Sequence, residues 1–200
     1  MRRSSLLRRA SVVVASAAAA VLVGAGTASA APAPGPADAV AELQALAAAH
    51  SPAAVEAASA LADSLLVPQD ILVTLPETFL YPAPTLGCGV GDLPITFTIA
   101  TAQPGFNLAP FLIQQGELRF QALPLDIAIP SGSDLTVLWI NLSTFQVGSA
   151  ALDDTALGVP TFSKTVETGE GPVLAALFGG TSYLGGGECF VLPTVGIFEA

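Results

Sequence analysis

From residue 68 onward, the chain is built of short apolar or alternating segments that are separated by turns rich in glycine and proline. These segments recur at a spacing of roughly ten residues, and no helical pattern lies between them. Parallel strands need long crossover connections, usually helices, so the pattern favours antiparallel pairing. It predicts a mainly β fold, an antiparallel β-sandwich over residues 68–200, with an immunoglobulin-like arrangement as the leading form.

Periodicity locates the individual strands. Residues 95–99 alternate strictly between apolar and polar, which is typical of a half-buried strand. Residues 118–122 alternate in the same way, so Arg119 is expected to face water. Residues 135–142 are apolar nearly throughout, which predicts a central strand around Trp139. Further strands are expected at 71–75, 125–129, 161–168, 173–178, 189–192 and 195–198, and turns at 76–92 and 131–134.

Two alanine-rich segments precede these strands. Residues 38–49 have the apolar spacing of a helix, and Ser51 followed by Pro52 can start a second helix as its N-cap and first helical residue. An alanine stripe buries little area, so this helical arm, residues 37–67, should be marginal alone. We expect residues 68–200 to fold without it.

The first thirty residues have the layout of a secretory signal peptide. Four of the six basic residues lie within the first nine positions, an apolar run follows, and Ala28-Ser29-Ala30 matches an A-x-A exit. We expect residues 1–30 to be removed, which leaves a proline-rich leader at 31–36 and a secreted or cell-envelope protein. Beyond residue 30, no apolar run reaches the roughly 18 residues that a transmembrane span needs.

Without the predicted signal peptide the chain is strongly acidic. Two basic residues, Arg119 and Lys164, face sixteen acidic ones, which gives a formal charge of −14. Such a surface repels the phosphates of nucleic acids and anionic lipid headgroups, so we expect no nucleic-acid partner. A protein partner or an envelope component is compatible with this charge, and the oligomeric state is left open.

Cys88 and Cys189 are the only cysteines. An even number of cysteines in an exported chain predicts a disulfide. Because the two residues lie 101 positions apart, the bond should stabilise the fold by roughly 4–5 kcal/mol through the entropy of the unfolded chain. Cys88 lies in a loop rich in glycine and proline, so the bond is expected to staple this loop to the penultimate strand.

No residue pattern predicts a catalytic centre, a cofactor site or a metal site. The single histidine, His50, is expected to be a solvated helix-end residue away from the β-body. Asp153 and Asp154 are expected in a turn, bonded to nearby amides, in preference to a calcium site or a hydrolytic acid pair. Asn141 begins a glycosylation sequon, but it lies within a predicted strand and receives no weight.

The segment 103–115 is predicted to be a long loop rich in proline and glycine. It carries Phe106, Phe111 and Leu112. Exposed aromatic and apolar side chains on a loop mark a contact surface. These three residues are therefore candidate contact residues.

Several short motifs stand out in the body: Gly87-Cys88-Gly89, Leu93-Pro94-Ile95-Thr96, Gln103-Pro104-Gly105, Gly158-Val159-Pro160-Thr161 and Leu192-Pro193-Thr194-Val195-Gly196 after Cys189. With them, the chain from Leu86 onward resembles uncharacterised small secreted proteins of actinobacteria. None of these motifs is catalytic, so the resemblance implies an envelope-associated or released protein and assigns no activity.

The sequence thus favours a secreted or envelope-associated, non-enzymatic binding module. One alternative is an oligomeric envelope channel or coat subunit, which the apolar content and the helical arm allow. A second alternative is a carboxylate-dependent hydrolase that uses Asp153 and Asp154.

Overall fold

The structure is a computed structural model that describes residues 35–64, 77–88, 94–105, 107–108, 111–125, 128–185 and 187–200. The predicted signal peptide, the expected strand at 71–75 and most of the 31–36 leader lie outside these residues. Ala33–Ala200 is one compact unit.

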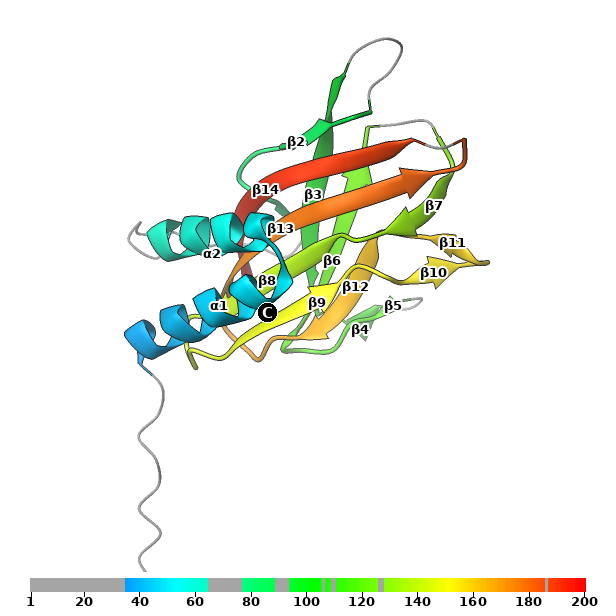
Figure 1. Ribbon diagram of the computed structural model, residues 1–200. Coiled ribbons are helices and arrows are strands. Elements are labelled where there is room, and N and C mark those ends of the chain that lie inside the picture. Colours follow the sequence, from blue (N-terminus) through cyan, green and yellow to red (C-terminus); the bar gives the residue numbers. More distant parts are fainter. Residues whose placement is uncertain are drawn as a thin grey trace, which may run out of the picture. The chain divides into compact units, whose positions relative to one another are not determined.

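In the described chain, two helices precede fourteen strands (Figure 1). The helices are α1 (Pro36–His50) and α2 (Pro52–Ser64). The strands are β1 (Glu77–Thr78), β2 (Ala83–Leu86), β3 (Ile95–Pro104), β4 (Asn107–Leu108), β5 (Phe111–Leu112), β6 (Glu117–Pro124), β7 (Pro130–Ser133), β8 (Thr136–Asn141), β9 (Val147–Ala151), β10 (Thr155–Ala156), β11 (Val159–Pro160), β12 (Ser163–Glu167), β13 (Pro172–Tyr183) and β14 (Glu188–Glu199).

Both predicted helices are present. Helix α1 begins at Pro36, two residues before the expected start, because proline is favoured at the first helical position. The Asp38 carboxylate accepts a hydrogen bond from the Gly35 amide at 3.1 Å and secures this end. At the second helix, the Ser51 hydroxyl accepts the bond of the Ala54 amide at 3.1 Å, as the sequence predicts.

The strands pair in the antiparallel manner that the sequence predicts, and the mainly β sandwich is confirmed. The main hydrogen-bonded path runs β12-β6-β3-β2-β14-β13-β8-β9, and it curls into a nearly closed, barrel-like sandwich (Figure 1). An immunoglobulin-like sandwich has two separate sheets, whereas here the eight strands of this path, together with β1 and β7 beside it, form one sheet of ten described strands. A bulge between Leu177 and Gly179 allows the long strand β13 to curve within it.

Three predicted turns or breaks are strands instead. The 76–92 region contains β2, and its Pro84 is tolerated because β14 pairs with β2 only at Thr85 and Leu86, where amides are present. The predicted turn at 131–134 forms β7, which pairs with the end of β13. The segments 189–192 and 195–198 are one continuous strand, β14.

Side chains on the two sides of the sheet form two separate cores. The inner core fills the sandwich and includes Trp139, Phe120 and Phe198. The outer core lies between the sheet and the helices, so the arm packs on the body. Its helix residues are fully buried: Ala39, Leu43, Ala47, Ala54, Ala57, Ala58 and Leu61. They cover a set of outward side chains that we call the covered half: Leu138, Ile140, Leu174, Ala176, Phe178 and Val195.

The alternation of β3 is confirmed, with Thr96 and Thr98 directed inward. Thr96 and Thr98 are buried, while Ile95 and Phe97 are about half exposed. The next even-numbered residue, Ala100, also faces the inner core. Even-numbered residues therefore face inward along the ten-residue strand. Leu125 is likewise exposed. The described residues of the 125–129 segment (125, 128 and 129) lie outside any strand, so the expectation of a strand is wrong for them.

Candidate functional site

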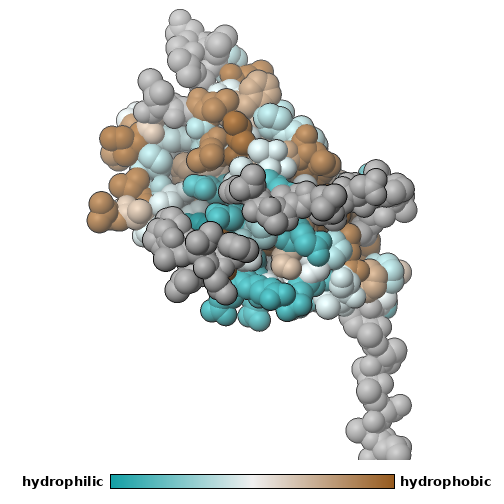
Figure 2. Space-filling view, turned by 180° about the vertical axis from the view of Figure 1, so that it is seen from behind, coloured by the Kyte–Doolittle hydropathy of each residue, from teal (hydrophilic) through white to brown (hydrophobic). Residues whose placement is uncertain are grey.

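An apolar patch lies on the outer side of the sheet. Six large side chains, five from four neighbouring strands and Leu125 just after β6, are each between 38% and 51% exposed. The strand register aligns them, because Phe190 pairs with Leu86, which pairs with Ile95. Figure 2 shows apolar side chains gathered in the upper part of this face. We call these residues the shelf: Leu86, Ile95, Phe97, Leu123, Leu125 and Phe190.

A groove borders the shelf at the end of the helix layer. A cavity of about 530 Å³ is lined by residues of the α1–α2 junction, of β13 and of the shelf. A second cavity, of about 410 Å³, is lined by residues of β2, β13 and β14. Asp134, Gly180 and Phe190 line both cavities, so together they form one groove. These volumes lie in the range of small-molecule sites.

A glycine of β13 allows the groove to form. Gly179 has a φ of +128°, and a Cβ at this position would collide with the Asp134 carbonyl. The Asp134 amide donates a hydrogen bond to the Gly180 carbonyl at 2.8 Å. The β7–β8 connection can therefore lie directly against β13, which places Asp134 on the groove.

Two carboxylates, Asp134 and Glu188, give the groove its charge. Both residues are exposed. Within the described ranges, no side-chain donor or basic group bonds to either carboxylate. The groove therefore presents unpaired negative charge beside an apolar surface.

The two basic residues that follow the predicted signal peptide are held elsewhere, in an ion network on β6 and β12. Lys164 Nζ lies 2.7 Å from Asp153 Oδ1, and Arg119 Nη1 lies 3.2 Å from Asp154 Oδ2. Arg119 also donates to the Ser163 hydroxyl at 2.7 Å. Arg119 thus faces outward as expected, but partners cover it in part. The two acids bind cationic side chains, and Asp153 has a backbone hydrogen bond as well.

The ion network bears on one role of Asp153, that of a general acid. The hydrogen bond and charge of Lys164 lower the pKa of Asp153, and the same hydrogen bond raises the pKa of Lys164. A general acid needs a carboxyl whose pKa is raised, so Asp153 is poorly suited to that role. Among the residues that the structure describes, no group of three or more potential ligands could hold a metal ion.

His50 lies against the β-body, which corrects the expectation that it is remote. Its Nε2 atom is 3.3 Å from the Ser149 hydroxyl of β9, because α1 packs across β8 and β9. No carboxylate of the described chain bonds to His50, so a Ser-His-Asp arrangement is not assembled there. His50 is also part of the groove wall.

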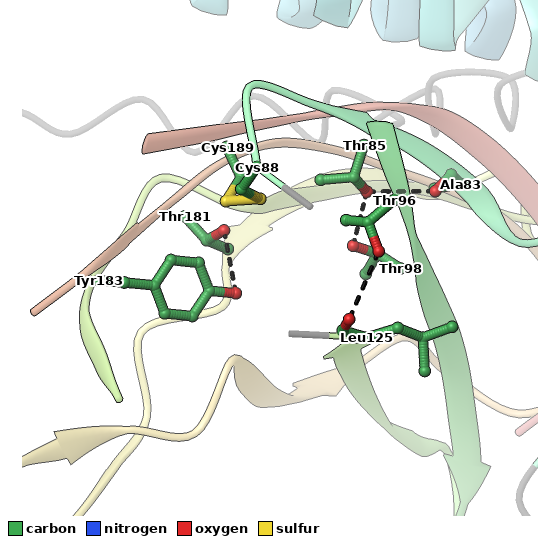
Figure 3. Close-up of a disulfide and its surroundings, with 9 residues drawn as sticks. All are labelled: Ala83, Thr85, Cys88, Thr96, Thr98, Leu125, Thr181, Tyr183 and Cys189. Atoms are coloured by element: carbon green, nitrogen blue, oxygen red, sulfur yellow. Dashed lines mark hydrogen bonds between the residues drawn. A yellow bond between two sulfur atoms is a disulfide. The ribbon is translucent and has the colours of Figure 1, made fainter. Parts of the chain in front are cut away.

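The predicted disulfide is present and joins the end of β2 to β14, the last strand instead of the penultimate one. Figure 3 shows Cys88 and Cys189 near a set of inward hydroxyls. Among them, the Thr85 and Thr98 hydroxyls lie 2.8 Å apart. Cys189 also lines the smaller cavity, so the bond fixes one wall of the groove.

The sequon residue Asn141 has a structural role. It is fully buried, and both ends of its amide are bonded. Its Nδ2 atom donates to the backbone carbonyls of Thr168, Gly169 and Glu170. Its Oδ1 atom accepts hydrogen bonds from the backbone amides of Ser143 and Thr144. The side chain clamps two turns together and is not accessible to a sugar.

The predicted contact loop contains a small hairpin. Phe111 and Leu112 form β5, which pairs with β4, so this part of 103–115 is not an irregular loop. Phe106 lies outside the described residues. The contact role of Phe106, Phe111 and Leu112 stays a prediction.

The shelf was missed because alternation does not say which side of a strand faces inward. Side-chain size gives no signal for the choice, since Phe120 and Phe198, as large as Phe97 and Phe190, fill the interior. Asp134 and His50 were placed in a turn and at a helix end, and only folding brings them to one groove.

No helix in the described part of the chain is long and apolar enough to cross a lipid bilayer. Comparison with known proteins gives no match, whether to a protein family, to a curated protein or to a solved structure.

Proposed function

We propose that this protein is a secreted or envelope-associated, non-enzymatic binding module that holds a ligand on the shelf and in the adjoining groove. The observation that carries the proposal is the shelf itself. Six apolar side chains, five from four adjacent strands and Leu125 just after β6, stay about half exposed, although helices cover another part of the outer side of the same sheet. An exposed apolar patch of this kind marks a binding surface.

Export is supported by two features. The basic head, apolar run and A-x-A exit of residues 1–30 fit a signal peptide. The disulfide fits an oxidising compartment outside the cytosol. A binding role at such a site needs no catalytic group, and the groove offers carboxylates, backbone groups and apolar walls instead.

An uncharged amphiphile tests the proposal. Octyl glucoside, kept below its micelle concentration, is titrated into the isotope-labelled chain 31–200 and followed by amide NMR. We expect saturable shifts centred on Leu86, Ile95, Phe97 and Phe190, since binding removes their apolar surface from water. Amides of Arg119 and Lys164, in the ion network, should not move.

A variant pair locates the effect. The double variant Phe97→Ser plus Phe190→Ser should weaken binding at least about tenfold, which corresponds to losing two half-buried aromatic contacts. Leu157→Ser is the control, because Leu157 is fully exposed on the β10–β11 turn and lies outside the shelf. Absence of any saturable shift, or self-association through the shelf without the probe, would overturn the proposal; the latter result favours an oligomeric subunit.

A further inference from the structure

We infer that the ligand of this module is a small cationic amphiphile, with its apolar chain on the shelf and its positive group in the groove between Asp134 and Glu188. This inference rests on the proposed binding function and names the chemistry that it selects. Three properties of the surface support it: continuity, charge and size.

The shelf and the groove form a continuous surface. Phe190 belongs to the shelf and lines both cavities, and Leu86 belongs to the shelf and lines the smaller cavity. Direct pairing of Phe190 with Leu86 places the two side chains next to each other on β14 and β2. One molecule that covers the shelf therefore also reaches the polar end.

Charge selects a positive group for that end. Asp134 and Glu188 line the smaller cavity together, and neither is bonded to a cation of the described chain. Arg119 and Lys164 cannot neutralise them, since both are held by Asp153 and Asp154. His50, on the far wall, is bonded to Ser149. A cation beside two carboxylates gains Coulomb energy, whereas an anion is repelled.

The apolar surface selects an amphiphile over a free metal ion. Two exposed carboxylates are too few ligands for calcium, which takes six to eight oxygens, and a bare ion gains nothing from six apolar side chains. Cavities of about 410 and 530 Å³ also suit a small molecule. A single aliphatic chain joined to an amine or ammonium group matches both parts of the surface.

Three probes with the same octyl chain separate the contributions. Octyltrimethylammonium, octyl glucoside and octyl sulfate are titrated below their micelle concentrations into the chain 31–200. We expect the cation to bind at least about tenfold more tightly than the glucoside, and the sulfate to bind most weakly. The preference for the cation should shrink as salt is raised from 50 to 500 mM, because salt screens exposed charges.

Charge variants test the assignment to the groove. Asp134→Asn plus Glu188→Gln should reduce the affinity for the cation to that of the glucoside and leave glucoside binding unchanged. Glu167→Gln plus Glu170→Gln removes the same net charge from exposed positions outside the groove and should retain most of the preference. This control distinguishes local pairing from the field of the whole acidic chain.

The outcomes are distinguishable. Equal affinity for all three probes, or equal loss in both double variants, would overturn the inference while the proposed binding function stands. No saturable binding of any probe would overturn both. Binding of the cation that depends on Asp134 and Glu188 and shifts the amides of Phe190 and Leu86 supports the inference.

Discussion

The covered half and the shelf lie on the same outer side of one sheet and carry the same kind of side chain, yet only the first is buried. Under the helices, Leu138 and Ile140 are fully buried; on the shelf, Ile95 and Leu125 are 51% exposed. Strand β14 crosses the boundary, with Val195 beneath the helices and Phe190 on the shelf. Residue type therefore does not separate the two regions; the presence of a covering layer does.

The two regions are also held together differently. The covered half is stabilised by side chains of α1 and α2 that fill the space above the sheet. At the shelf, β2 and β14 share only two registered residue pairs, and the Cys88–Cys189 bond lies beside them. A covalent link thus secures the ladder in the region where no described helix packs. The shelf can remain open without loss of the sheet.

Removing the disulfide should have the largest effect and should act first on the shelf. The double variant Cys88→Ser plus Cys189→Ser is expected to lose about 4 kcal/mol of unfolding free energy, because the unfolded chain regains the entropy of a 101-residue loop. Chemical denaturation measures the loss, and hydrogen exchange should show β2 and β14 opening before α2. A loss below about 1 kcal/mol, or α2 opening first, would contradict this view of the shelf.

A matched pair of leucine variants compares the stability lost at a position in the helix layer with that lost on the exposed shelf. Leu61 of α2 is fully buried over the covered half, whereas Leu123 on the shelf is 47% exposed. Leu61→Ala should cost about 2–4 kcal/mol, from lost burial and the cavity left behind. Leu123→Ala should cost less than about 1 kcal/mol. Urea unfolding followed by Trp139 fluorescence measures both, and equal losses would show that the shelf is buried in solution.

A substitution of Glu77, which lies outside the covered half and the shelf, should change stability in a way that depends on pH. Burial, and then the charge of Glu199, raises the pKa of Glu77, whose Oε1 atom has no hydrogen-bond partner. The folded state therefore favours the protonated form, so Glu77 contributes most stability below its ordinary value of 4.5 and loses it as the pH rises through the folded pKa. Glu77→Gln should raise the Tm by about 1–3 °C at pH 7.

The same variant should give no gain at pH 3.5, where the folded and unfolded states both hold the proton. Calorimetry at the two pH values measures the difference. An equal rise at both values would point to packing instead of charge, and a fall at pH 7 would show that the Glu77 carboxylate is stabilised by a partner.

Local rules in the sequence account for much of the architecture. Ser51 and Pro52 mark the start of α2, the apolar run around Trp139 marks the buried strand β8, which lies between β13 and β9, and the two cysteines form the predicted bond. Strand β7 was missed because glycine and serine at 131–134 favour turns locally, while pairing with β13 holds them extended. Independent folding of residues 68–200 stays a prediction, although Leu43 and Leu61 of the arm are fully buried.

Neighbouring residues and composition are enough to predict the mainly β class of fold, the start of α2, the strands β8, β12 and β13, and the strongly acidic charge. Only the tertiary structure shows that Thr96 and Thr98 face inward, that the helices cover only part of the outer face, and that His50, Asp134 and Phe190 line one groove. Periodicity defines the two sides of a strand, but long-range pairing and the space inside the sandwich decide which side is buried.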